Sequence, residues 1–502
     1  MAVTIAIDAG TTGVRSLAVD TAGAIVGHSY REFGQHFPQP GWVEHDAAEI
    51  WDVVVETLTE LVALVPATVA AIGITNQRET VVMWDRRTGA PLHRAIVWQD
   101  RRTASRCQQL VDEGRLDRIR RLTGLVLDPY FSGSKIEWLM NEGGVQVGHD
   151  TLVGTIDSWI LWNLTGGTDG GVHATEPSNA SRTMLYDIRA LSWSEELCDL
   201  FGVPTSILPE VLPSAGRFGV TTAGSPVGAG VAVSGIAGDQ QAALFGQACF
   251  TPGMSKNTYG TGSFVLMNVG ESCPEPTDGL LTTVAWTVPG SFLGQAASTV
   301  THYALEGAIF VTGAAIQWLR DGLGILGDAS ETEPTALSVA DTGGVVMVPA
   351  FTGLGSPWWD PYARGTVLGI NRGTTRAHLT RAAVESMAMQ TRDVVTAMTE
   401  ASGQPLAELR VDGGAAVMDL LLCLQTEQLG VPVTRSAVTE TTALGAAYLA
   451  GLCEGVWTDT TEVTSAWASD ARFEPPADRT AADAAHRRWL RAVDRSRAWA
   501  VD

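Results

Sequence analysis

The sequence predicts an α/β fold with two similar domains. At 502 residues the chain exceeds the roughly 250 to 300 residues that one hydrophobic core serves. Strand-like and helix-like hydrophobic periodicities alternate along it, as in α/β proteins. Two segments with the same order of strand, Gly-Thr turn and strand stand about half a chain apart. We therefore place one domain in residues 1–246 and the other in residues 247–502.

The first of these hairpins opens the first domain. Residues 4–20 read as two apolar strands joined by a tight turn at Gly10 to Gly13. Asp8 ends the first strand, and the turn offers free N–H groups and the hydroxyls of Thr11 and Thr12. Such a turn can hold phosphate oxygens, and the neighbouring carboxylate can hold hydrated magnesium. A Gly-Thr hairpin is, however, more often only a turn.

Further elements of the first domain place polar residues at strand ends. An amphipathic helix is predicted over 48–64 and a buried strand over 69–74, with Arg78 and Glu79 just beyond the strand. A donor next to an acceptor can fix the hydroxyls of a polyol, although a surface ion pair is the simpler reading. Asp239 follows a run of small residues and precedes an apolar helix. It is either a helix cap or a general base.

The second domain opens with the other hairpin, over 257–270, with its turn at Gly260-Thr261-Gly262. A second glycine turn, Asp412-Gly413-Gly414, follows a short strand at 409–411. Three glycine turns at strand ends could converge on one nucleotide in a cleft between the domains. Helices are expected over 304–319, 378–399, 442–452 and 480–499, and a turn-rich segment over 351–361.

Composition excludes several classes of function. A formal net charge of -22 disfavours nucleic acid as a partner. No apolar run reaches the roughly 18 residues of a membrane-spanning helix, and we expect a cytoplasmic protein. The six cysteines form no Cys-x-x-Cys pair, which argues against a structural zinc site. The only lysines, Lys135 and Lys256, stand in no P-loop or protein-kinase motif, so any ATP must be held by another architecture.

Two long spaced patterns resemble the signatures of the FGGY carbohydrate kinases. The segment 130–142, Tyr-Phe-Ser-Gly-Ser-Lys-Ile-Glu-Trp-Leu-Met-Asn-Glu, resembles one signature, and 365–370 through 378–385 resembles the other. Four more segments resemble the members that phosphorylate glycerol: 73–80, 98–103, 238–246 and 256–268. The resemblance extends from Ile5 to about Leu452. It implies an actin-like (ribonuclease H-like) ATPase fold whose two domains close on a central cleft.

The resemblance also implies an activity and a set of residues. The expected reaction is ATP- and Mg²⁺-dependent phosphorylation of glycerol to glycerol 3-phosphate, with Asp239 as the base and Asp8 positioning magnesium. The implied glycerol-binding residues are Arg78, Glu79, Trp98, Tyr130, Asp239, Gln240 and Phe264. The implied ATP-binding residues are Thr11, Thr12, Arg15, Gly260, Thr261, Gly313, Gln317, Gly414 and Met418. A homodimer or homotetramer is expected.

Three positions depart from the family pattern. Gly13 and Val14 stand where the family has two serines, which removes possible hydroxyl contacts to phosphate. Met418 stands where the family commonly has an asparagine near adenine, and a thioether can pack against a base but cannot donate to it.

Two alternatives to glycerol phosphorylation stay open. One is a kinase for another polyol or ketose, such as erythritol or xylulose, because one changed wall residue would alter the length of the pocket. The other is a nucleotide-binding regulator on the same scaffold without chemistry. Loss of Asp8 or Asp239 would mark such a regulator, and both are present.

Overall fold

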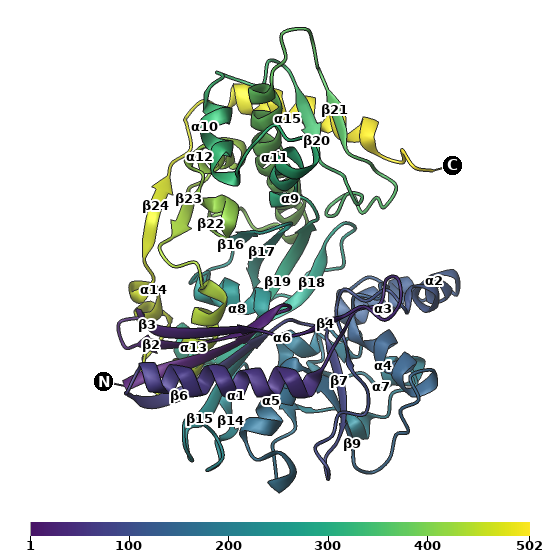
Figure 1. The fold of residues 1–502 in the computed structure, drawn as a ribbon, viewed down its shortest axis with the longest axis vertical. Coiled ribbons are helices and arrows are strands. Elements are labelled where there is room, and N and C mark those ends of the chain that lie inside the picture. The colour runs from purple at the N-terminus through teal and green to yellow at the C-terminus, as the bar shows by residue number, and fades with distance from the viewer. Residues whose placement is uncertain (1, 502) are drawn as a thin grey trace.

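The computed structural model describes residues 2–501, which form two lobes stacked along the long axis of the molecule (Figure 1). The first lobe is built on a six-stranded sheet in the order β14-β15-β6-β1-β2-β3. Its strands are β1 (Ala2–Ala9), β2 (Gly13–Asp20), β3 (Ile25–Glu32), β6 (Thr68–Asn76), β14 (Ala215–Val220) and β15 (Ala232–Gly238). β1, β6 and β15 run parallel, while β2, β3 and β14 run antiparallel to their neighbours.

The second lobe repeats this topology. Its sheet has the order β18-β19-β17-β16-β22-β23-β24. The strands are β16 (Met254–Tyr259), β17 (Ser263–Gly270), β18 (Leu281–Pro289), β19 (Thr299–Ile309), β22 (Glu408–Asp412), β23 (Val433–Ser436) and β24 (Ser469–Phe473). β16, β22 and β23 are parallel, as β1, β6 and β15 are, and β17, β19 and β24 take the antiparallel places of β2, β3 and β14. Two similar domains are therefore confirmed, with β18 as an added edge strand.

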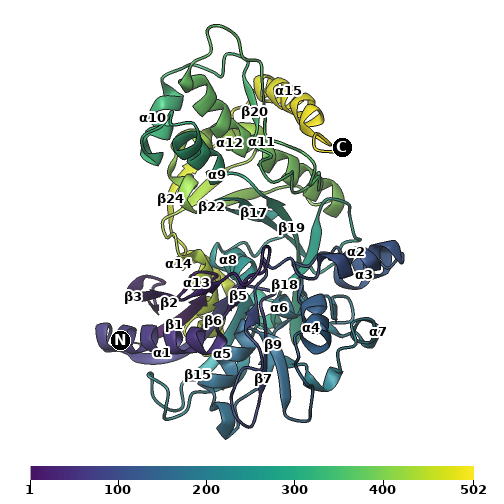
Figure 2. The ribbon, with the colours of Figure 1, turned by 45° about the vertical axis from the view of Figure 1, so that its right-hand side comes forward.

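Helices cover both faces of the first sheet. α1 (Ala47–Leu64) packs on β2 and β3, and α5 (Ile156–Leu164) packs on β6. The opposite face is covered by α8 (Asp239–Gly246) and α13 (Thr441–Cys453), which also pack against each other. α8 reaches β16, β17 and β18 as well, so it lies between the two sheets. α13 comes from the second half of the chain yet packs on the first sheet, as Figures 1 and 2 both show. The predicted boundary at residues 246 and 247 stays a prediction.

A smaller sheet extends the first lobe. Its order is β4-β5-β8-β7-β9, with bounds Gln35–His36, Glu44–His45, Ala95–Ile96, Val81–Asp85 and Thr151–Thr155. Four short helices pack on it: α2 (Ala104–Asp112), α3 (Leu116–Thr123), α4 (Ser132–Asn141) and α7 (Glu195–Leu200). A fifth, α6 (Pro177–Ala180), packs on β15 and β18. The second lobe adds a hairpin of β20 (Val346–Val348) and β21 (Thr366–Leu368). It also carries α9 (Gly313–Gln317), α10 (Thr332–Leu337), α11 (Arg376–Ser402), α12 (Asp419–Leu429), α14 (Thr460–Ala466) and α15 (Thr480–Ser496).

One predicted element is wrong. The segment 304–319, expected to be one helix, is the end of β19 followed by the short α9. Ala304 and Leu305 pair with β18 and β17, because both neighbours offer free ladder positions and small or apolar residues fit a buried strand. The other predicted helices and both hairpins are confirmed, with ends shifted by a few residues. Among residues 2–501, no helix is long and apolar enough to cross a membrane.

Candidate active site

A cleft of about 930 Å³ lies between the lobes. The first lobe contributes Trp98, Tyr130 and Gln240 to its walls, and the second contributes Gly260, Thr261 and Phe264. All six were predicted from the sequence as site residues. The two lobes meet through α8, which contacts both sheets, and through α6, which packs on β18 of the second sheet. The structure thus brings residues that were predicted to bind the acceptor, and a glycine turn, to one opening.

Arg78 and Glu79 lie at the carboxyl end of β6, as the strand prediction required. Both side chains are buried, so they are not the surface ion pair of the simpler reading. Glu79 has a left-handed backbone, with φ of 63°, which is uncommon outside glycine. Its carbonyl accepts a hydrogen bond from the Ser132 hydroxyl at 3.1 Å, and its Oε1 accepts one from Arg182 Nε at 2.6 Å. These contacts hold the carboxylate in a fixed place.

Asp239 is the first residue of α8, and its side chain is 32% exposed. Oδ1 accepts a hydrogen bond from the backbone N–H of Gln240 at 2.7 Å and lies 3.0 Å from Arg78 Nε. Gly238, not Asp239, is the cap residue of α8. The carboxylate is therefore not committed to capping the helix. It keeps an exposed part beside Arg78, where it can accept a proton from a bound hydroxyl.

Two buried residues at the site were missed by the sequence reasoning, Arg182 and Glu306. Glu306 Oε2 lies 2.6 Å from Arg78 Nη1, and Glu306 Oε1 lies 3.1 Å from Arg182 Nη2. Burial alone would raise the pKa of Glu306, but Arg182 and Arg78 outweigh it and lower the pKa to about 2. Arg182 lies in an Asn-Ala-Ser-Arg run with no periodic signal. Glu306 lies in the segment that was read as a helix.

Three aromatic side chains line the cleft, and Thr11 is hydrogen-bonded to one of them. Trp98 and Tyr130 meet edge to face, with ring centroids 5.5 Å apart, and Phe264 faces the same cleft from β17. The Tyr130 hydroxyl accepts a hydrogen bond from Arg78 Nη2 at 3.3 Å. The indole N–H of Trp98 donates to the Thr11 hydroxyl at 2.9 Å. An apolar wall with charged groups at one end suits a small polyol, whose C–H faces and hydroxyls differ in polarity.

Each of the two Gly-Thr hairpins is closed by a backbone hydrogen bond between its glycines. Gly10 N–H bonds to the Gly13 carbonyl at 3.0 Å, and Gly260 N–H bonds to the Gly262 carbonyl at 2.8 Å. The N–H of Gly313, at the start of α9, bonds to the Gly260 carbonyl at 3.0 Å. A Cβ on Gly313 would lie 2.6 Å from that carbonyl oxygen, so only glycine permits this approach.

Comparison with known proteins agrees with this geometry. A model of the FGGY family of carbohydrate kinases, N-terminal domain, matches residues 3–246, and the model of its C-terminal domain matches residues 255–453. The chain belongs to the FGGY family of carbohydrate kinases.

Full-length relatives narrow the comparison. The chain is 52% identical to a glycerol kinase of Carboxydothermus hydrogenoformans and 51% identical to glycerol kinase 2 of Thermotoga maritima, in each case over 99% of both chains. It matches the crystal structure of Plasmodium falciparum glycerol kinase with ADP at a TM-score of 0.93 and 34% identity, over 99% of this chain and 98% of that one. Gluconate kinase of Lactobacillus acidophilus, at 20% identity and a TM-score of 0.86, shares the fold.

The departures of this FGGY kinase from the family turn have a local cause. A Cβ on Gly13 would overlap the carbonyl of Arg31 and the ring of Tyr30 on β3. Tyr30 thus excludes any side chain at position 13 in this chain. Val14 is fully buried in the core against α1, so its side chain points away from the turn. The backbone donors of the turn are unaffected by either residue.

The remaining predicted nucleotide residues are spread over both lobes. Thr12, Thr261, Gln317 and Gly414 are exposed, whereas Arg15 is half-buried and forms an ion pair with Glu440 just before α13. Met418 is 7% exposed and packs in the second lobe's core, while the neighbouring Val417 is 67% exposed. The structure therefore presents Val417, not Met418, at the surface beside Gly414.

The surroundings of Asp8 fit a divalent cation. Burial, together with the charge of Asp239, raises the pKa of Asp8 to about 7, against a smaller lowering by Arg15. A hard cation that binds oxygen ligands reduces the repulsion between two carboxylates. Mg²⁺ typically takes one or two carboxylates plus phosphates and water. Within residues 2–501, no group of three or more His, Cys, Asp or Glu side chains could hold a metal alone.

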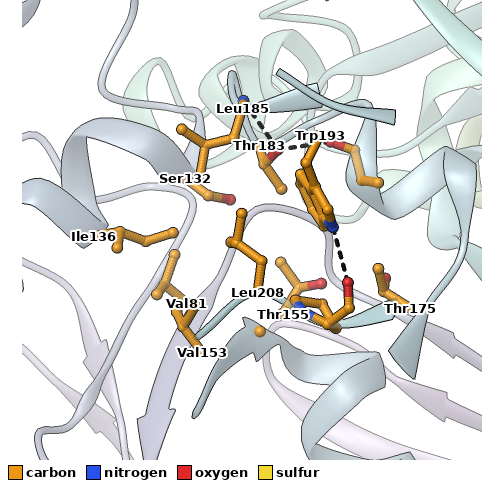
Figure 3. Close-up of a pocket in the computed structure, with 13 residues that line it drawn as sticks. Val81, Ser132, Ile136, Val153, Thr155, Thr175, Thr183, Leu185, Trp193 and Leu208 are labelled. Atoms are coloured by element: carbon orange, nitrogen blue, oxygen red, sulfur yellow. Dashed lines mark hydrogen bonds between the residues drawn. The ribbon is translucent and has the colours of Figure 1, made fainter. Parts of the chain in front are cut away.

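A separate cavity of about 20 Å³ lies inside the first lobe (Figure 3). It is lined by apolar side chains such as Val81 and Leu208, and by hydroxyls whose partners lie within the protein. Ser132 bonds to the Glu79 carbonyl, and the Trp193 indole N–H bonds to the Pro209 carbonyl at 2.8 Å. The volume suits one water molecule, so this cavity is a packing feature beneath Glu79 and no substrate site.

Proposed function

We propose that the protein transfers the γ-phosphoryl group of ATP to a terminal hydroxyl of glycerol. The observation that carries this proposal is the position of Asp239, whose partly exposed carboxylate lies 3.0 Å from Arg78 Nε and directly precedes Gln240, a residue that lines the cleft. The names of relatives about 50% identical over the full chain support glycerol as the acceptor. Arg78, Glu79, Tyr130 and Gln240 would hold the hydroxyls, and Trp98 and Phe264 would flank the carbon chain.

The chemistry divides between the lobes. Asp239 takes the proton of the attacking hydroxyl, and the oxygen forms its bond to the γ-phosphorus as the bond to the β–γ bridging oxygen breaks, releasing ADP. The turns at Gly10 and Gly260 would donate backbone N–H groups to the phosphates. Mg²⁺ beside Asp8 would offset the negative charge of the phosphates. Closure of the cleft would exclude water as a competing acceptor.

The nucleotide site is proposed on the same basis. Thr11, Thr12, Arg15, Gly260, Thr261, Gly313, Gln317, Gly414 and Met418 would line it, and Val417 is the exposed neighbour of Met418. Support comes from the glycine turns and from the match to a structure described with ADP. We also infer that the enzyme acts in the cytoplasm, where ATP is supplied, and as a homodimer or homotetramer. Light scattering of the purified protein would measure its assembly.

A panel of acceptors tests the proposal. ADP release is measured with glycerol, erythritol and xylulose at saturating ATP. We expect the highest kcat/KM with glycerol, because the aromatic wall ends at charged residues close to Asp239. A higher kcat/KM with the four- or five-carbon acceptor would replace glycerol by that substrate. No release above the rate without acceptor would favour the non-catalytic regulator.

A further inference from the structure

Two buried, oppositely charged side chains of the second lobe reach into the acceptor site of the first. Lys256 on β16 and Glu306 on β19 are both fully buried. They stand in one row across the sheet, because Lys256 pairs with Leu266 of β17 and Leu266 pairs with Glu306. Residues in such a row share one face of a sheet. Leu266 packs in the core that holds α8, so this face is the one turned towards the first lobe.

Each of the two residues ends on a side chain that flanks Asp239. The ammonium of Lys256 donates to Gln240 Oε1, and it lies 3.1 Å from the Thr258 hydroxyl, two residues before Gly260. The carboxylate of Glu306 accepts two hydrogen bonds from Arg78, at 2.6 and 3.2 Å. Gln240 follows Asp239 in the chain, and Arg78 Nε is 3.0 Å from its Oδ1. Two contacts from the opposite lobe thus end on the side chains of Gln240 and Arg78, the neighbours of Asp239.

A buried ion pair does not by itself indicate a function, and many such pairs add nothing to stability. The ion pair of Arg217 and Glu454 serves as a comparison, because it also joins the two halves of the sequence. That pair lies outside the residues that line the cleft. Lys256 and Glu306 differ from that pair because both contact proposed substrate-binding residues. Both are also fully buried, so neither serves as a surface charge.

We propose that Lys256 and Glu306 are positioning residues, through which the second lobe fixes Gln240 and Arg78 around Asp239. This inference rests on the proposed function. Neither residue is among those that line the cleft. The ammonium of Lys256 can only donate, so it bonds to the carbonyl oxygen of the Gln240 carboxamide. This orients the carboxamide with its NH₂ group towards the cleft. Glu306 holds the guanidinium of Arg78 in one plane by a bidentate contact.

The charge of Lys256 provides a readout that a purely structural role would not give. Burial lowers the pKa of Lys256 to about 8, and the charges that face it are Asp412 on β22, Asp239 on α8, Glu306 on β19 and Arg78 after β6. A lysine is charged below its pKa. We therefore expect kcat/KM for glycerol to fall as the pH rises through 8, as the ammonium loses its proton and its hold on Gln240.

The test compares Lys256→Met, Glu306→Gln and the control Glu454→Gln with the unmodified enzyme. KM for glycerol should rise roughly tenfold or more in the first two, as for a lost hydrogen bond to a charged group, with KM for ATP within about twofold. Lys256→Met should also lose the decline above pH 8. Glu454→Gln should match the unmodified enzyme in all three quantities.

Two results would overturn the inference. One is an unchanged KM for glycerol in a folded Lys256→Met variant, with the alkaline decline retained. The other is an equal rise of both KM values, which would indicate general loosening of the cleft. If Glu306→Gln does not fold, the Lys256→Met result decides. Failure of the unmodified enzyme to phosphorylate any polyol would instead refute the proposed function, and the inference with it.

Discussion

The indole N–H of Trp98 donates a hydrogen bond to the Thr11 hydroxyl over 2.9 Å. Trp98 belongs to the aromatic wall of the cleft, and Thr11 belongs to the first glycine turn. Because the hydroxyl oxygen accepts from the indole, its own O–H is left free to donate to a phosphate oxygen. A hydrogen bond therefore joins the aromatic wall of the cleft to the first glycine turn.

Trp98→Phe removes this donor and keeps an aromatic wall. We expect kcat/KM for ATP to fall roughly fivefold to tenfold, as for the loss of one hydrogen bond of ordinary strength. Steady-state kinetics at saturating glycerol measures it. Trp193→Phe is the matched control, because that indole donates to the Pro209 carbonyl away from the cleft. Equal effects of the two substitutions would count against the link between Trp98 and the phosphate site.

Asp8→Asn should stabilise the ligand-free protein while it abolishes turnover. The pKa of Asp8 is raised to about 7 in the folded protein, so the folded state favours the protonated carboxyl. The contribution of Asp8 to stability is therefore full at low pH and is lost as the pH rises towards 7. The variant should unfold roughly 2–4 °C higher than the unmodified protein at pH 8, in the absence of nucleotide and magnesium.

Calorimetry at pH 8 and at pH 5 measures this difference. The gap should shrink at pH 5, where Asp8 of the unmodified protein is largely protonated. A gap of the same size at both pH values would show that the charge of Asp8 is not its source.

Gly445→Ala should destabilise the protein by about 1–3 kcal/mol or more, as overpacking does in a close-packed core. Gly445 lies on α13 where that helix crosses α8, and a Cβ there would overlap the carbonyl of Ala242. Chemical denaturation measures the free energy of unfolding. Gly224→Ala is the control, because a Cβ at Gly224 would meet no atom within 4 Å. A loss of similar size in both variants would contradict a close helix contact at Gly445.

The fold could be predicted from the sequence because its elements carry local signals. The two Gly-Thr hairpins, the amphipathic α1 and the small-residue α13 follow from periodicity and turn chemistry. β19 could not be predicted in this way, because Gly307 and its alanine neighbours suit a helix or a buried strand, and only the pairing with β17 and β18 decides. A fully buried strand lacks the alternation that would identify it.

The site could be predicted only where polar residues follow strand ends. Arg78, Glu79 and Asp239 satisfy that rule, and the family resemblance named the aromatic wall. Arg182 and Glu306 do not satisfy it: they meet Arg78 and Glu79 from sequence distances of more than 100 residues. Such charges are paired by tertiary packing, which no local pattern encodes. The position of Met418 likewise depends on which way a short turn faces.

The central claim is that Asp239 acts as the base at a cleft between two lobes. The measurement that tests it most directly is a single turnover of Asp239→Asn with ATP and bound glycerol, alongside the affinity for glycerol by calorimetry. The variant should bind glycerol with an affinity within a few fold of the unmodified enzyme, while phosphoryl transfer slows roughly 100-fold or more. Transfer at a near-normal rate would contradict the account.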